Sequence, residues 1–396
     1  MTGKVILPKF DNYILLNKFG LRLLGLWPIP EDSAKWKFTL KKLHVSLVYV
    51  LLLSLLVPQL LDLYILWGDV DANVENLCTS LTTFTVLAKL TNIVASRGVF
   101  QKSLATMKEN WDTIMRHDNC PEEREILLKM SKVGFVFTRN YCIIMYITAG
   151  MYFLRPLVVG SGTKSPHVKE YPFCAWYYYD QFSNLTYGIF YFSQVIIGFF
   201  CGTGNFTLDS LCLVMVYHAC AQLRILQKQI SQLTNDGSDD ILIVERVRQL
   251  VKLHKKNIEN ARNLEAVFSG ASAQQLLVSC VIICVIGLKL IVSLNDAFQL
   301  IMYVAYMQLV IFQIYLYCSP GDELINQSME IGRAAYMASW TNFPKYATHS
   351  LLMMTIRAQR PLRITAGRFY VMSIPNFTSI LKTSASYLSV LRVLYD

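Results

Sequence analysis

The chain has 396 residues, of which 54% are hydrophobic and only 16% are charged. This balance excludes a large soluble enzyme and indicates an integral membrane protein. The net charge of +10 does not call for nucleic acid as a partner, because basic loops beside anionic lipid account for it and no nucleic-acid recognition motif is present.

Apolar stretches long enough to cross a bilayer recur along the chain. Each stretch is continuously apolar, without the alternation of a barrel strand, so each is expected to cross as a helix. The sequence therefore predicts an all-α integral membrane fold with seven transmembrane helices. They are expected at about 43–67, 77–96, 133–154, 182–220, 264–294, 297–319 and 369–393.

Lys and Arg alternate between the gaps that separate these spans. The leader before the first span is basic, and so are the gaps at 97–132, 224–262 and 333–363, whereas the gap at 68–76 contains neither Lys nor Arg. Positive charge stays cytoplasmic, so the N-terminus is expected inside the cell and the C-terminus outside. This is the reverse of a G-protein-coupled receptor.

The fourth and fifth spans continue beyond the bilayer as helical patterns. Apolar residues recur at helical spacing in 241–258, and a further cytoplasmic helix is expected between Ile325 and Met354. These long helices are expected to pack together as an intracellular anchor layer, although separate flexible loops would also fit the pattern. We expect a six-span sensing region at 1–319, a cytoplasmic anchor at 320–366 and a seventh helix at 367–396.

Charged residues within the spans need an explanation, because a charge at mid-bilayer costs roughly 2.5–3.5 kcal/mol. Lys89, Arg139 and Lys289 are expected near span ends, where their long side chains can reach the interface. Cys78 and Cys174 fall on the predicted outer side and can pair. No phosphate loop, nucleophile elbow or zinc motif is present, so neither an enzyme nor a bound cofactor or metal is expected.

The last span is rich in hydroxyl groups. Ser379, Thr383 and Ser386 share one face at helical spacing, and Val390 and Leu394 continue that face. Such a stripe can pack against neighbouring helices, or it can line water and close at the two apolar residues as a hydrophobic gate. A pore would require an oligomer, because one helix cannot enclose it.

Aromatic and Met side chains gather in spans two, three, four and six. Clusters of this kind usually pack together, but around a cavity they would bind a small hydrophobic ligand, with one or two hydroxyls to orient it. No charged residue among them would recruit an ionic ligand.

Motifs in the C-terminal third resemble the insect odorant receptor family. They are Tyr317-Cys-Ser-Pro-Gly-Asp-Glu-Leu-Ile325 after span six, Ile356-Arg-Ala-Gln-Arg-Pro-Leu362, Thr365-Ala-Gly-Arg-Phe369, and Ile380-Leu-Lys-Thr-Ser-Ala-Ser-Tyr387 with Val390-Leu-Arg392. The upstream two thirds resemble the family in topology and length. The chain departs from the family at Ala385 and Leu388, where an aromatic residue and Phe are frequent.

The resemblance implies a ligand-tuning subunit in the plasma membrane of olfactory sensory neurons. Such a subunit assembles with the shared odorant-receptor co-receptor as a heterotetramer, an odour-gated non-selective cation channel. The family's gate would fall on Val390 and Leu394, beside Ser386. Its pocket for a small volatile ligand would fall on Phe84, Tyr146, Ile147, Gly150, Leu154, Phe190, Ile197, Tyr303 and Tyr306.

Other functions remain open at this point. A gustatory-type receptor channel has a similar architecture, a metabotropic receptor requires an extracellular N-terminus, and a transporter would show substrate flux without channel-like current. The co-receptor itself is disfavoured, because the cytoplasmic segment between spans four and five is short in this chain.

Overall fold

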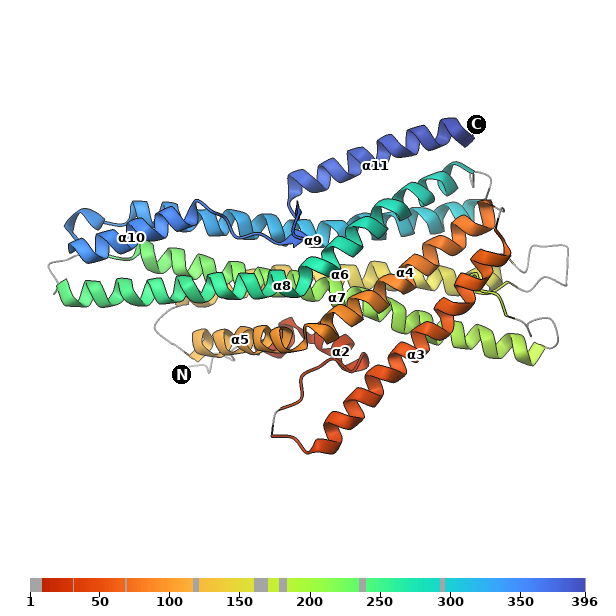
Figure 1. The fold of residues 1–396 in the computed structure, drawn as a ribbon, viewed down its shortest axis with the longest axis horizontal. Helices are drawn as coiled ribbons and strands as arrows, with labels where there is room; N and C mark the ends of the chain where they lie inside the picture. The colour runs from red at the N-terminus through yellow and green to blue at the C-terminus, as the bar shows by residue number, and fades with distance from the viewer. Residues whose placement is uncertain are drawn as a thin grey trace, which may run out of the picture.

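The computed structural model is a long bundle of helices (Figure 1). It describes residues 9–30, 32–67, 70–116, 121–159, 170–177, 184–234, 240–292 and 296–395, with the backbone alone described at 70–72, 159, 291–292 and 390–395. In chain order the elements are α1 (Phe10–Tyr13), α2 (Leu15–Leu23), α3 (Lys35–Ile65), α4 (Val70–Ala95), α5 (Arg97–Arg116), α6 (Pro121–Val159), α7 (Asn184–Ser231), α8 (Asp240–Val292), α9 (Ala297–Met337), η1 (Trp340–Asn342), α10 (Lys345–Ala358), β1 (Thr365–Ala366), β2 (Tyr370–Val371) and α11 (Ile374–Tyr395).

The described part of the chain contains six helices that are long and apolar enough to cross a membrane. They are Lys35–Ile65, Asn73–Ala95, Pro121–Val158, Asn184–Ser231, Asp240–Leu290 and Ala297–Met337. The predicted all-helical, multi-span fold is therefore confirmed. The seventh predicted span corresponds to α11, whose side chains are described as far as Ser389.

Helix α7 is the centre of the bundle. It packs along α6 and α9, and side chains on all of its faces are buried over most of its middle. A helix that is apolar all round is typical of a position surrounded by other helices. The polar side chains in this buried stretch, Asn205 and Asp209 among them, therefore face other helices and not lipid.

At one end of the bundle, α5, α10 and the extended ends of α7, α8 and α9 form a helical layer (Figure 1). Helix α9 runs through Pro320 without a break as far as Met337, and the next α-helix begins at Lys345. The helix expected between Ile325 and Met354 is therefore two segments, one of which is the continuation of span six.

A two-stranded antiparallel hairpin connects α10 to α11, with Thr365 opposite Val371. Its turn uses Gly367 at φ 65° and Arg368 at φ 70°, a left-handed conformation that favours glycine. The backbone N–H of Gly367 donates to the Ser269 carbonyl of α8 at 3.0 Å. The Thr365-Ala-Gly-Arg-Phe369 motif thus fixes the start of α11 against α8.

Helix α11 lies on the outside of the bundle (Figure 1). Ile380 and Ser384 are buried, and Leu388 contacts the backbone of α8 so closely that a Cβ on Gly287 would lie 2.6 Å from Leu388 Cδ2. Ser379, Thr383 and Ser386 are exposed. The predicted hydroxyl stripe is therefore on the face of α11 that no other part of the described chain covers.

Candidate functional site: a cavity in the bundle

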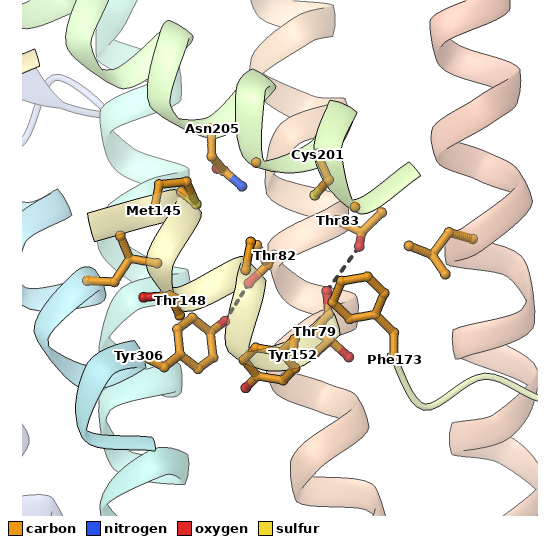
Figure 2. Close-up of a pocket in the computed structure, with 15 residues that line it drawn as sticks. Thr79, Thr82, Thr83, Met145, Thr148, Tyr152, Phe173, Cys201, Asn205 and Tyr306 are labelled. Atoms are coloured by element: carbon orange, nitrogen blue, oxygen red, sulfur yellow. Dashed lines mark hydrogen bonds between the residues drawn. The ribbon is translucent and has the colours of Figure 1, made fainter. Parts of the chain in front are cut away.

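A cavity of about 70 Å³ lies between α3, α4, α6, α7, α9 and the segment 170–177 (Figure 2). It is smaller than the ~150 Å³ apolar cavity that accommodates benzene. Its wall is mainly apolar with a set of hydroxyl groups. The lining residues are Leu55, Thr79, Thr82, Thr83, Met145, Thr148, Ala149, Tyr152, Phe173, Gly198, Cys201, Gly202, Asn205, Tyr306 and Leu309.

The threonine hydroxyls in the wall donate their protons back to their own helices. Thr82 Oγ1 donates to the Cys78 carbonyl at 2.9 Å, Thr83 Oγ1 to the Thr79 carbonyl at 3.0 Å, and Thr148 Oγ1 to the Ile144 carbonyl at 2.9 Å. A hydroxyl has only one proton, so these groups offer a ligand lone pairs and methyl surface.

Tyr306 connects two walls of the cavity. Its hydroxyl donates to Thr82 Oγ1 at 2.6 Å, since the Thr82 proton is directed to the Cys78 carbonyl, and it lies 3.0 Å from that carbonyl oxygen. These contacts join α9 to α4. Its ring meets that of Tyr152 edge-on, with the centroids 5.9 Å apart. A ligand that enlarges the cavity would therefore disturb contacts among α4, α6 and α9.

Phe173 covers one side of the cavity. Its backbone N–H donates to Gln194 Oε1 at 2.9 Å, and its carbonyl accepts from Gln194 Nε2 at 3.2 Å. Gln194 is fully buried, so both groups of its amide hold the segment 170–177 to α7. Arg155 forms ion pairs with Glu75 and Glu170, which ties the same segment to α4 and α6.

A buried polar network begins at Asn205 and extends away from the cavity along α7. Lys89 Nζ donates to Asp209 Oδ1 at 2.5 Å and to Asn205 Oδ1 at 3.3 Å. Tyr141 and Tyr317 also donate to Asp209, at 2.9 and 2.6 Å. The network links α4, α6, α7 and α9 next to the cavity.

The expectation that Lys89 reaches the membrane interface was wrong. Its side chain is 1% exposed and is paired with Asp209. A charge that cannot reach water needs a buried counter-charge and full hydrogen bonding. Asp209, an acid within the fourth apolar span, was the signal in the sequence for this pair.

The structure places some of the predicted pocket residues at or near the cavity. Tyr306 lines it. Tyr303 and Ile197 are buried in the surrounding core without lining it, at 3% and 6% exposure. Tyr146 is half-buried, its hydroxyl 2.7 Å from Thr203 Oγ1. Phe190 stacks on Tyr177 of the segment 170–177, with 4.3 Å between the ring centroids.

Other predicted pocket residues face away from the cavity. Phe84, Ile147 and Leu154 are 49%, 55% and 54% exposed on the outside of the bundle. A Cβ on Gly150 would meet nothing within 4 Å. These four residues lie on the predicted helices, but on the opposite face from the lining residues of α4 and α6. Lipid and protein core are equally apolar, so hydropathy does not select the inward face.

The predicted gate lies largely outside the described side chains. Ser386 is exposed on α11, whereas Val390 and Leu394 belong to the end of α11 where the backbone alone is described. Cys78 and Cys174 are both free thiols. Among the described residues, no group of His, Cys, Asp or Glu could hold a metal ion.

A sequence model of the 7tm Odorant receptor family matches residues 69–385. Odorant receptor 13a of Drosophila melanogaster is 25% identical over 400 residues, covering 95% of this chain and 94% of the relative. Odorant receptor Or2 of Anopheles gambiae is 22% identical over 345 residues, covering 85% of this chain and 89% of the relative.

The fold is similar to that of a solved insect olfactory receptor. The structure of OR5 from Machilis hrabei in complex with eugenol matches with a TM-score of 0.78 and 17% sequence identity, covering 97% of this chain and 100% of that one. The structure of the same receptor described without a named ligand matches with a TM-score of 0.79 and 18% identity, covering 96% and 97%.

Proposed function

Because the chain belongs to the 7tm odorant receptor family, a family of membrane receptors and not of enzymes, we propose that it is the ligand-tuning subunit of an odour-gated cation channel. In this proposal it assembles with the shared odorant-receptor co-receptor as a heterotetramer in the plasma membrane of olfactory sensory neurons. The N-terminus and the helical layer of α5 and α10 face the cytoplasm.

The observation that supports ligand binding best is the cavity between α3, α4, α6, α7 and α9. Its wall is mainly apolar and lacks a charged side chain among the lining residues, which suits a small uncharged volatile. The similar Machilis receptor was solved with eugenol, a molecule of that class. A ligand of about ten heavy atoms would bind with roughly −5 to −8 kcal/mol, an affinity of about 100 to 1 μM.

Helix α9 connects this cavity directly to α11. Tyr306 lines the cavity, and Tyr315 on the same helix meets Phe377 of α11 edge-on with the ring centroids 5.7 Å apart. Nine residues of helix span only about 13 Å. A ligand that binds the expanded cavity more tightly than the closed one would shift the position of α9, and with it the equilibrium of α11.

The exposed hydroxyl face of α11 supports a role for this helix in a shared pore. In the proposed tetramer, Ser386 lines the water-filled part, and Val390 and Leu394 close it in the resting state. Dewetting at an apolar constriction would then block ions until α11 moves. Packing of the stripe against a neighbouring subunit is the competing role.

The proposal is tested by expressing the chain with and without the co-receptor and recording current during a panel of volatiles. We expect inward, cation-carried current only with both subunits, and within milliseconds of ligand arrival. Current that requires a G protein would indicate a metabotropic receptor, and responses confined to soluble tastants would indicate a gustatory-type channel. Absence of any response from a complex that reaches the cell surface would refute the proposal.

A further inference from the structure

The Asn205 amide nitrogen has no acceptor in the part of the chain that the structure describes, although the side chain is 0% exposed. Leaving such a donor unpaired costs about 1–3 kcal/mol. Asn205 lines the cavity, and Figure 2 shows its nitrogen turned toward the other labelled pocket residues. A hydrogen-bond donor without a partner among the described residues therefore lies in the cavity wall, and a ligand reaches it as the wall moves to admit the ligand.

The orientation of this amide is fixed by its neighbour. Asn205 Oδ1 accepts from Lys89 Nζ at 3.3 Å. An ammonium group only donates, so the oxygen of the amide must face Lys89 and the nitrogen must face the opposite side. Lys89 is itself held by Asp209 at 2.5 Å, and Asp209 by the hydroxyls of Tyr141 and Tyr317. The buried ion pair thus presents the donor to the cavity.

The other polar groups in the wall do not compete for this role. The hydroxyls of Thr79, Thr82, Thr83 and Thr148 donate to backbone carbonyls, and that of Tyr306 donates to Thr82 Oγ1. The Tyr152 hydroxyl has no partner among the described residues, but in Figure 2 it lies at the far side of the labelled set from Asn205. The Cys201 thiol also lines the cavity, but an S–H group is only a weak donor. Among the described lining residues near Asn205, the amide is therefore the strongest donor.

We propose that Asn205 selects volatiles that carry a hydrogen-bond acceptor, with a ketone or aldehyde oxygen accepting from Asn205 Nδ2 while the hydrocarbon part fills the space toward Phe173. This inference rests on the proposed function, because it assigns the ligand class of the same cavity. In this proposal Asn205 makes the hydrogen bond to the ligand, and the other lining residues contribute shape and apolar contacts.

Transfer energies make this proposal sharply testable. Moving a carbonyl group from water into an apolar site costs free energy unless a donor meets it, whereas a hydrocarbon gains by the same transfer. A cavity without an available donor would therefore prefer the alkene in which a methylene group replaces the carbonyl oxygen. A cavity with the Asn205 donor would prefer the carbonyl compound.

The experiment compares three pairs of such isosteres on the complex with the co-receptor: acetophenone with α-methylstyrene, benzaldehyde with styrene, and cyclohexanone with methylenecyclohexane. The half-maximal concentration of each volatile is expressed as its free concentration in the aqueous solution. For wild type we expect the carbonyl member of each active pair to act at about 3- to 10-fold lower concentration. For Asn205→Leu we expect the order within the pairs to reverse.

The matched control is Asn140→Leu, the same change at an exposed position of α6. It should preserve the wild-type order. The wild-type comparison stands even if Asn205→Leu fails to reach the surface. Equal or better activation by the alkenes in wild type, an unchanged order in Asn205→Leu, or a channel opened by other volatiles but by no carbonyl compound would each overturn the inference. A surface-expressed complex that no volatile opens would instead refute the proposed function.

Discussion

Lys89 and Asp209 form an ion pair inside the helical bundle, with 2.5 Å between Nζ and Oδ1 and side chains that are 1% and 0% exposed. Two tyrosine hydroxyls complete the hydrogen bonding of the carboxylate. Breaking such a pair by removing one partner leaves a buried, uncompensated charge, which costs roughly 3–5 kcal/mol.

We therefore expect Asp209→Asn and Lys89→Leu each to lower surface expression and the thermal midpoint of the purified protein. The double variant retains an acceptor for the tyrosines but contains no charge. Its thermal midpoint should therefore fall by less than the sum of the decreases in the two single variants. Fluorescence-detected size exclusion after heating measures all of these proteins. Additive losses would contradict a direct interaction between the two charges.

Gly198 allows the segment 170–177 to approach α7. A Cβ at this position would lie 2.8 Å from ring carbons of both Phe153 and Phe173. Gly198→Ala should displace Phe173 and raise the half-maximal odorant concentration by roughly 5-fold or more, since overpacking costs about 1–3 kcal/mol. Dose–response curves of the channel complex provide the measurement.

Gly188 on the same helix provides the control for helix propensity. A Cβ there would meet nothing within 4 Å. Gly188→Ala should leave odorant sensitivity as in wild type. Equal shifts in the two variants would mean that the contact of Gly198 with the two rings is not what matters.

The Cys174 thiol should react slowly with water-soluble thiol reagents at neutral pH. Burial raises the pKa of this thiol from its ordinary value to about 11. The reactive species is the thiolate, so the modification rate should rise about tenfold per pH unit between pH 7 and 9 without reaching a plateau. The rate is obtained by subtracting that of Cys174→Ser. A plateau near pH 9 would indicate an ordinary, exposed thiol.

Two serines of α11 distinguish a pore from simple packing. Ser386 is exposed, whereas Ser384 is 3% exposed against α8. In the proposed channel, Ser386→Cys should be modified by a charged thiol reagent during odour application, with a loss of current, and Ser384→Cys should react at least about tenfold more slowly. If Ser386→Cys stays unmodified while the channel is open, α11 does not line the conducting path there.

The sequence predicted the helices more accurately than their faces. Continuous apolar stretches identified α3, α4, α6, α7, α8 and α9, because the energetic requirement to pair every backbone group in lipid leaves few alternatives. Because the spans are apolar on all sides, the sequence does not show which face of each helix points into the bundle. Phe84 and Ile147 were therefore predicted in the pocket, although both face outward. Thr83 and Thr148 were missed because isolated hydroxyls in a span are usually bonded to their own helix.

Long-range pairing was the other part that the sequence did not reveal. Lys89 and Asp209 are far apart in the chain, and nothing local indicates that α4 and α7 bring them together. The same applies to Asn205, whose role depends on which side of its amide Lys89 occupies. A search for acids within apolar spans would have suggested the ion pair but not the donor that it orients.

The small resting volume of the cavity has a consequence for how this receptor can change its preferences. A ligand of about ten heavy atoms does not fit a space of about 70 Å³. A pocket that fits the ligand therefore forms only when Met145, Phe173 and the residues packed behind them move apart. What a given odour must overcome is then the stiffness of the surrounding side chains. Substitutions one shell behind the cavity wall, where no odorant atom ever reaches, should retune the receptor as readily as changes in the wall itself.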